Sequence, residues 1–409
     1  MSEWKEYKLS DFIEINPKVT LKSGSKNSFV EMKDLSESQK FVLPSQLKEI
    51  KGGARFQNFD TLFARITPCL QNGKICQVKG LKNSIGFGST EFLVFRGKEG
   101  ISNTDFVYYL SRYDVVRKFA EQNMIGTSGR QRVSKDAFEN IELLLPDLPT
   151  QTAIAEILSS FDDKIELNNK INKELESLAQ SLFKQWFIDF EFPNENGEPY
   201  KSSGGEMLDS ELGEIPKGWK IDSLDNIAEF LNGLALQKFP AESDYEFLPV
   251  IKIRELRQKD TSNSDKASVN IPEKYIIEDG DVLFSWSGSL MIDFWTNGKG
   301  ALNQHLFKVT SKKYPKWYYY LWTKHHLTEF IAIAESKATT MGHIQRQHLT
   351  NAKVLVPTED IITIFSLVFE PIISKIIDNR IECGELIKLR DTLLPKLISG
   401  EIEINETNN

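Results

Sequence analysis

A long stretch near the middle of the chain, residues 148–187, has apolar residues every three or four positions and almost no helix breaker after Pro149. This spacing places the apolar residues on one face of an α-helix. Such a helix is roughly 55–60 Å long at ~1.5 Å per residue, which exceeds the width of a small domain. We therefore expect one long helix over residues 149–188, with something at each end that it connects.

The apolar residues of this helix follow a 4-3 spacing, which is the heptad pattern of a coiled coil. Residues 357–402 carry the same pattern 211 positions later. Asn168 and Asn379 place an amide at matching positions, which costs stability but fixes register. The pattern predicts two long helices that pair antiparallel, although packing of each helix on its own domain would also produce it. The predicted seam positions are Ile154, Leu158, Phe161, Ile165, Asn168, Asn172, Leu175, Ala179, Leu182 and Trp186, followed by Phe365, Phe369, Ile372, Ile376, Asn379, Cys383, Leu386, Arg390, Leu393 and Leu397.

The chain repeats itself with a shift of 211 residues. "DFVYYLSR" at 105–112 aligns with "KWYYYLWT" at 316–323, and Pro146 aligns with Pro357. A period this long indicates a duplicated unit, not a solenoid. The segment between the copies is rich in Pro, Gly, Ser and acidic residues, as expected of a linker. The expected segments are a first body at 1–148, a helix at 149–188, a linker at 189–215, a second body at 216–356, a helix at 357–402 and a tail at 403–409.

Each body has mixed secondary-structure signals. Buried strands are predicted in "DTLFARI" and "TEFLVFRG" of the first body and in "DVLFSWS" and "QHLFKVT" of the second, and helical periodicity follows in both. "GFGST" at 86–90 lacks a following Lys, so we interpret it as a turn and not as a phosphate-binding loop. The expected fold is α/β or α+β, with two duplicated bodies separated by two long antiparallel coiled-coil helices.

Composition and charge narrow the functional classes. A chain of 409 residues is too long for one ordinary core, and 40% hydrophobic with 26% charged residues is typical of a soluble globular protein. No apolar run is long enough for a transmembrane helix, and three cysteines without a Cys-x-x-Cys fit a reducing cytoplasm. The negative charge lies in the long-helix regions together with the linker, since residues 149–215 carry 14 acidic and 5 basic residues whereas residues 1–148 carry 18 and 22. A mildly basic body is compatible with DNA binding, although this signal alone is weak.

No constellation of catalytic residues stands out in the sequence. It contains neither the Gly-x-x-x-x-Gly-Lys-Ser/Thr of nucleotide-binding loops nor the Asn/Asp-Pro-Pro-aromatic tetrapeptide of amino-methyltransferases. His343 and His348 are five apart, not the four of a helical metal pair. Asp60 and Asp281 recur at the starts of matching strands beside turn residues, which favours a turn role. We expect no catalytic residue, metal or cofactor in this chain.

Each body instead offers polar loops beside its aromatic strands. Arg, Asn, Gln, Ser and Thr read base edges in the DNA major groove, and Lys and Arg bind phosphate. Solvated surface loops would have a similar composition. The loops differ between the copies while the scaffold matches, as two readers of different half-sites would. The candidate DNA-contacting residues are Arg65, Thr67, Lys74, Ser128, Arg130, Gln131 and Arg132 in the first body, and Ser285, Trp286, Ser287, Ser289, His343, Gln345 and Arg346 in the second.

Several segments together resemble the specificity subunit of Type I restriction–modification systems. They are "LPTQTAIAEILSSFDDKIELNNKINKELESLAQSLFKQWF" from Leu148, "FPNENGEPYKSSGGEMLDSELGEIPKGW" from Phe192, and "LRDTLLPKLISGEI" from Leu389. Inside the bodies, "LFARITPCLQNGKI" and "LFSWSGSL" are similar to two subtypes of target recognition domain. The second copy departs from the pattern, since it has "VPTEDII" in place of Leu-Pro-x-Gln, so its helix start is expected to be less well formed.

The resemblance implies a function for each part of the chain. The bodies would be target recognition domains that each read half of a bipartite site on double-stranded DNA, and the helices would set the gap between the halves. The helices would also dock two modification subunits, which use S-adenosylmethionine. Two restriction subunits, which use ATP and Mg, would complete a cytoplasmic complex without contact to a membrane. The alternatives are a single-chain nuclease or methyltransferase, which would show activity alone, and a scaffold, which would show no salt-dependent DNA binding.

Overall fold

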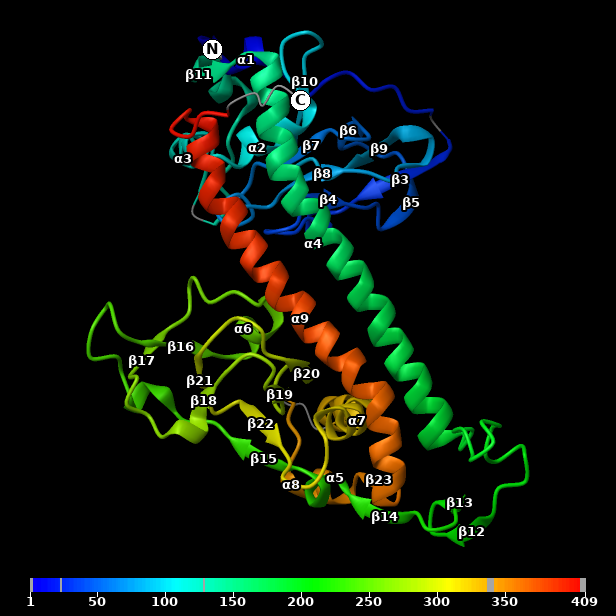
Figure 1. The fold of residues 1–409 in the computed structure, drawn as a ribbon. Coiled ribbons are helices and arrows are strands. Elements are labelled where there is room, and N and C mark those ends of the chain that lie inside the picture. The colour runs from blue at the N-terminus through cyan, green and yellow to red at the C-terminus, as the bar shows by residue number, and fades with distance from the viewer. Residues whose placement is uncertain (1–2, 23, 128, 337–341, 405–409) are drawn as a thin grey trace. The chain divides into compact units, whose positions relative to one another are not determined.

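The computed structural model describes residues 3–22, 24–127, 129–336 and 342–404 (Figure 1). The chain forms two compact units, one of residues 1–167 with 385–409 and the other of residues 168–384. Each unit therefore combines one body with a part of both long helices. The predicted mixed α/β fold with duplicated bodies and two long helices is confirmed.

The first unit contains a five-stranded sheet in the order β2-β10-β7-β8-β4, a four-stranded sheet in the order β5-β3-β9-β6 and a two-stranded pair, β1-β11. Every residue of β7 and β8 is buried, which explains why their sequences are mostly apolar and do not alternate. The elements are β1 (Trp4–Lys8), α1 (Leu9–Phe12), β2 (Ile13–Ile15), β3 (Lys26–Val30), β4 (Phe41–Val42), β5 (Gln46–Glu49), β6 (Ala54–Gln57), β7 (Thr61–Ala64), β8 (Ile75–Val78), β9 (Ile85–Gly88), β10 (Phe92–Gly97), α2 (Thr104–Arg112), α3 (Asp114–Gln122) and β11 (Glu142–Pro146).

The second unit contains two four-stranded sheets, in the orders β15-β22-β19-β20 and β17-β16-β21-β18, and the pairs β14-β23 and β12-β13. The elements are β12 (Met207–Ser210), β13 (Gly213–Pro216), β14 (Lys220–Ser223), α5 (Leu224–Ile227), β15 (Glu229–Asn232), β16 (Leu248–Ile251), α6 (Ile253–Gln258), β17 (Lys266–Ala267), β18 (Ile276–Ile277), β19 (Val282–Ser285), β20 (Met291–Phe294), β21 (Gly300–Leu302), β22 (Leu306–Thr310), α7 (Lys316–Ser336), α8 (Arg346–Asn351) and β23 (Lys353–Val356).

The strand orders of the two bodies match one another. The order β2-β10-β7-β8 corresponds to β15-β22-β19-β20, and β5-β3-β9-β6 corresponds to β17-β16-β21-β18. The parallel pairing is preserved as well. In the sheet β5-β3-β9-β6, β3 runs parallel to β9, and in the sheet β17-β16-β21-β18, β16 runs parallel to β21. The sequence repeat is therefore a repeat of topology, which allows residues of the two bodies to be compared position by position.

The long helices are α4 (Leu148–Phe183), which continues as a π-helical turn (Lys184–Ile188), and α9 (Glu359–Ile398). Their first residues are 211 positions apart, so the expectation that the second helix starts less well is wrong. Two acidic residues in the first turn of α9, Glu359 and Asp360, stabilise the exposed backbone N–H groups at that end of the helix.

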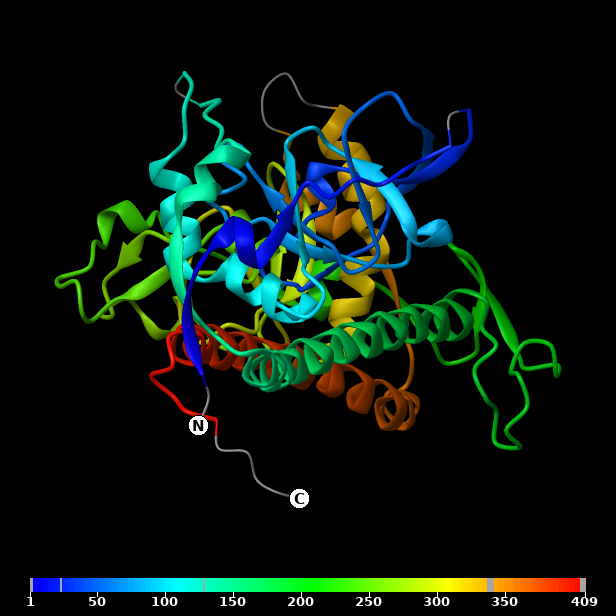
Figure 2. The ribbon, with the colours of Figure 1, turned by 90° about the horizontal axis from the view of Figure 1, so that it is seen from above.

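Within the second unit, α4 and α9 run antiparallel (Figures 1 and 2). They meet through buried amides. Asn379 donates to Asn172 Oδ1 at 2.9 Å, and Asn172 donates to the Ile376 carbonyl at 3.2 Å. Asn168 donates to the carboxylate of Glu382 at 2.7 Å. Because a shift of either helix would leave these amides without partners, the cluster fixes the register of the pair.

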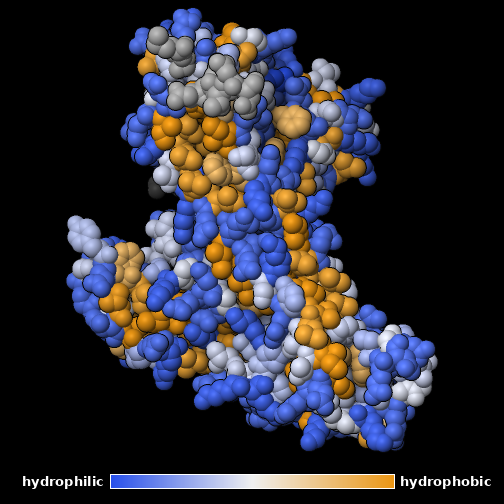
Figure 3. All heavy atoms as spheres, in the orientation of Figure 1, coloured by the Kyte–Doolittle hydropathy of each residue, from blue (hydrophilic) through white to orange (hydrophobic). Residues whose placement is uncertain are grey.

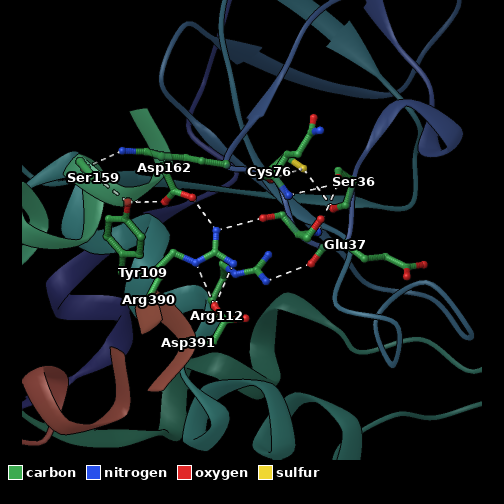
Figure 4. Close-up of polar contacts among 12 residues, drawn as sticks. Ser36, Glu37, Cys76, Tyr109, Arg112, Ser159, Asp162, Arg390 and Asp391 are labelled. Atoms are coloured by element: carbon green, nitrogen blue, oxygen red, sulfur yellow. Dashed lines mark hydrogen bonds and ion pairs between the residues drawn. The ribbon is translucent and has the colours of Figure 1, made fainter. Parts of the chain in front are cut away.

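Within the first unit, a buried ion pair joins the two helices to the body (Figure 4). Arg390 of α9 is fully buried and lies 2.5 Å from the carboxylate of Asp162 on α4. The same carboxylate accepts a 2.5 Å hydrogen bond from the hydroxyl of Tyr109 on α2, and Arg390 also donates to the Ser38 carbonyl at 2.9 Å. Burial lowers the pKa of Arg390, but Asp162 and Asp391 raise it by more, so the guanidinium stays charged.

The second unit has its own ion cluster in a different place. Arg380 of α9 pairs with Asp293 of β20 and, at 2.7 Å, with Glu176 of α4. Each body is therefore tied to both long helices by one arginine of α9. The tie determines how each body is oriented on its part of the helices.

One local expectation needs correction. Residues 86–88 of "GFGST" lie in strand β9 and not in a turn. A Cβ on Gly88 would lie 2.6 Å from the Val30 carbonyl oxygen and 2.9 Å from the Phe92 ring, so close packing of sheet against sheet explains the glycine. The helical periodicity at 103–123 produces two helices, α2 and α3, which are separated by the extended residue Tyr113.

Candidate nucleic-acid interface

In the first body, two polar loops that are distant in sequence are joined by backbone hydrogen bonds. The loop after β7, which begins at Arg65, forms an antiparallel bridge with residues 125–133 through Ile66 and Arg132. Thr67 donates its N–H to the Gln131 carbonyl at 3.0 Å, and the Thr67 hydroxyl accepts from the Gln131 N–H at 3.0 Å. These bonds fix the shape of the loop pair before any ligand arrives.

Glu91, which directly precedes β10, organises the cations of this loop pair. Arg132 donates to both oxygens of the Glu91 carboxylate at 2.7–2.9 Å, and Arg65 Nε lies 3.6 Å from the same group. The hydrogen bonds from Arg132 hold the pKa of Glu91 below its ordinary value, and Glu91 in turn raises the pKa of Arg132. The Nε and Nη2 donors of the Arg132 guanidinium are therefore occupied by Glu91. Arg130, by contrast, is exposed, and no ion pair to it is seen among the described residues.

The second body builds the same loop pair from different side chains. Ser287, in the loop after β19, forms an antiparallel bridge with His343, and the Ile344 N–H donates to the Trp286 carbonyl at 3.0 Å. The Trp286 indole N–H donates to Asn232 Oδ1 at 3.1 Å. Two imidazoles lie near the indole, with ring centroids 6.0 Å away for His305 and 6.2 Å away for His343.

Strand register shows that these clusters occupy equivalent positions. Ala64 pairs with Phe92 in the first body as Ser285 pairs with Leu306 in the second. The residue after the first strand is Arg65 or Trp286, and the residue before the second is Glu91 or His305. The bridging residue of the later loop is Arg132 or His343. We call these three positions the variable triad: ionic in the first body and aromatic in the second.

Some candidate residues support the loops and do not face outward. Ser285 is fully buried and donates to the Ser287 carbonyl, Ser287 is buried against His305, and Thr67 is buried under Gln131. Lys74 is partly buried and donates to the Met32 carbonyl at 3.2 Å. These side chains support the loops through contacts on their buried side.

Two further candidates in the second body have local partners. Arg346 lies over the Phe307 ring, 5.6 Å from its centroid, and donates to the Phe230 carbonyl at 3.2 Å. Gln345 caps the start of α8, where its N–H donates to His348 Nδ1 at 2.8 Å. Ser289 is exposed beside a small depression, and Ser128 lies outside the described residues.

Glu91 and His305, which directly precede strands, and Asn232, the last residue of β15, were missed as site residues because none carries a motif of its own. The signal that could have found Glu91 and His305 was present in the repeat. Once the strands "FLVF" and "LFKV" are aligned, these residues fall at the same place immediately before them.

The structure supports turn roles for Asp60 and Asp281, the aspartates that recur in the two copies of the repeat. Asp60 accepts from the Gln57 N–H at 2.7 Å and pairs with Arg96, and Asp281 accepts from the Glu278 N–H at 2.8 Å and pairs with Lys308. Burial raises the pKa of Asp60, and the Arg96 hydrogen bond opposes that shift. Over the residues that the structure describes, no cluster of His, Cys, Asp and Glu could hold a metal ion. No helix in that part of the chain has the length and apolar character needed to cross a membrane.

Comparison with known families gives the decisive observation. The sequence model of the Type I restriction modification DNA specificity domain matches residues 1–177 and again residues 216–391. The chain belongs to this family. The two matches coincide with the two copies of the repeat, and the family argues against the single-chain nuclease or methyltransferase that the sequence left open.

Individual members of the family are similar over most of the chain. The HindI specificity subunit of Haemophilus influenzae is 24% identical over 468 residues, with 98% of this chain and 100% of the relative covered. The MjaIX specificity subunit of Methanocaldococcus jannaschii is 25% identical over 316 residues, with 76% of this chain and 71% of the relative covered.

Solved structures of family members also align. The S subunit from M. genitalium aligns at 14% identity with a TM-score of 0.49, covering 99% of this chain and 97% of that one. The HsdS subunit from Thermoanaerobacter tengcongensis aligns at 16% identity with a TM-score of 0.34, covering 98% and 97%.

Proposed function

We propose that this chain is a DNA specificity subunit whose bodies, residues 1–148 and 216–356, each read one half of a bipartite site on double-stranded DNA. The observation that carries the proposal is the variable triad. The same loop pair, on the same strand order, presents an ionic cluster in one body and an aromatic cluster in the other. A shared scaffold with different contact chemistry is what recognition of two different half-sites requires.

The two bodies would read DNA by different means. In the first body, Arg130 supplies an exposed guanidinium for guanine or phosphate, and Glu91 holds Arg132 and Arg65 as a supporting frame. In the second body, His305 and His343 are exposed and lie near Trp286. An imidazole can donate to or accept from a base edge, and the indole offers a face for apolar contact.

The long helices would separate the half-sites and dock partner subunits. Each unit exposes apolar residues of both helices, among them Ile157 and Leu389 in the first and Leu178 and Val368 in the second. The 211-residue repeat relates Ile157 to Val368 and Leu178 to Leu389, so the chain offers the same kind of surface twice. Figure 3 shows hydrophobic side chains along the long helices. Two like surfaces suit two copies of one partner.

The proposed partners are two modification subunits and two restriction subunits. The modification subunits would bring S-adenosylmethionine and methylate adenine, and the restriction subunits would bring ATP and Mg for translocation and cleavage. This chain would contribute recognition and geometry without catalytic residues or a cofactor of its own. The complex would act in the cytoplasm, where the DNA lies.

The test is methylome sequencing of a methylation-free host that carries the modification subunit with and without this chain. The expected result is adenine methylation at one split motif, with two defined halves and an unspecified gap, only when both are present. Methylation by this chain alone, or a single uninterrupted motif, would contradict the proposal.

A further inference from the structure

A depression on the first body adjoins the loop pair. It is bordered by the segment after β2, by the start of β6 and by Arg65 of the loop pair. All three charged residues of its lining are cations: Lys18, Arg55 and Arg65. Thr20 and Thr90 add hydroxyl groups to the same lining. The depression is therefore a polar, positively charged surface that continues from the proposed recognition loops.

The walls of this depression are held in place by backbone contacts. Gly53 has a φ of +103°, and a Cβ there would lie 2.0 Å from the Gly88 carbonyl oxygen, so the chain before Arg55 presses directly on β9. Only glycine permits this approach. Arg55 also reaches the Val19 carbonyl at 3.5 Å, which connects the two walls. The backbone that carries Arg55 is thus held in place by the fold.

The second body lacks this arrangement. Arg55 pairs with Phe87 across its sheet as Ile276 pairs with Ala301, so Ile276 stands in the place of Arg55. Ile15 of β2 and Phe230 of β15 occupy equivalent positions in the strand register, so Gly233, three residues after Phe230, stands in the place of Lys18. Trp286 stands in the place of Arg65. All three cations of the first body are therefore replaced by uncharged residues.

We propose that the depression is a phosphate-backbone subsite, which takes DNA phosphates next to the half-site read by the first body. Lysine and arginine with neighbouring hydroxyl groups are the side chains that hold phosphate oxygens without reading sequence. The first body then carries a larger share of the salt-dependent affinity than the second. This inference rests on the proposed DNA-specificity function and adds where the sequence-independent contacts lie.

The test uses the full complex of this chain with its modification subunits and measures binding to its motif duplex and to a scrambled duplex across salt concentrations. The slope of log K against log salt is negative, and Lys18→Ala and Arg55→Ala are each expected to make it less steep by about 0.9. The two substitutions together should make it less steep by about twice that amount. Affinity should fall by the same factor on both duplexes, and the methylated motif should not change.

Lys118→Ala is the matched control, because Lys118 is an exposed lysine of the same body that lies on α3, outside the lining of the depression. It should leave the slope unchanged. Unchanged slopes in the Lys18 and Arg55 variants, or an altered methylation motif, would overturn the subsite while leaving DNA recognition intact. Failure of the wild-type complex to distinguish its motif from the scrambled duplex would instead count against the proposed function.

Discussion

The buried ion pair between Arg390 and Asp162 leads to a sharp prediction, because the repeat contains its apolar counterpart. A shift of 211 residues relates Asp162 to Ile373 and Ala179 to Arg390. Ala179 and Ile373 are both buried in the second unit, so the same place in the helix pair is apolar there. The double variant Asp162→Ile with Arg390→Ala copies that apolar pair into the first unit.

The expected free energies differ between the single and double variants. Arg390→Ala leaves the Asp162 carboxylate buried without its cation, which costs about 3–5 kcal/mol. The double variant removes both charges and buries an isoleucine, which contributes about 1.5–3 kcal/mol. It leaves the Ser38 carbonyl without its partner and the Tyr109 hydroxyl with only the 3.4 Å bond to Ser159, at about 1–3 kcal/mol each. The double variant should therefore be more stable than Arg390→Ala.

The assay is hydrogen exchange of the full chain, followed in peptides of α2 and of the β1-β11 pair. These elements belong to the first unit, and peptides of β19 and β22 in the second unit provide an internal control. Loss of protection in Arg390→Ala should be confined to the first unit and partly restored in the double variant. A double variant that loses as much as the two single variants added together would refute this reasoning.

Three further predictions concern the loops and the helices. Arg130→Ala should weaken DNA binding by about 1–3 kcal/mol without lowering stability. Arg132→Ala should chiefly loosen the loop pair. Measuring both the DNA affinity and the hydrogen exchange of the Gln131 amide separates these two effects. The lowered pKa of Glu91 means that its support for the loops is complete above the ordinary glutamate pKa and is lost as pH falls through the lowered value. Glu91→Gln should abolish this pH dependence of exchange at Gln131; persistence of the dependence would show that another group is responsible. Insertion of about one heptad into α4 should change the gap of the methylated motif or prevent assembly with the modification subunits, and an active complex with the original gap would show that the helix does not set the spacing.

The long helices could be predicted from the sequence because their periodicity depends only on the chain itself. The same is true of the four buried strands β7, β10, β19 and β22, whose apolar runs and repeat positions agree with the observed elements. The partners of the polar residues on the helices could not be predicted in this way. Arg390 occupies a seam position, yet its carboxylate partner and the Ser38 carbonyl come from segments far apart in the sequence.

The site was only partly predictable for a related reason. The loops were found from their polar composition, but composition does not distinguish exposed from supporting side chains. Arg130 and Arg132 look alike in sequence, and only the position of Glu91 shows that one is held and the other is exposed. The glycines of β9 were misinterpreted because a turn and a tightly packed strand both favour glycine.

The most direct test of the central claim is the exchange of one body. Residues 1–148 are replaced by the equivalent body of a relative with a different motif, and the methylome is sequenced in a host carrying the modification subunit. If each body reads one half-site, one half of the methylated motif changes, and the other half and the gap remain. A change in both halves, or in neither, would contradict the account.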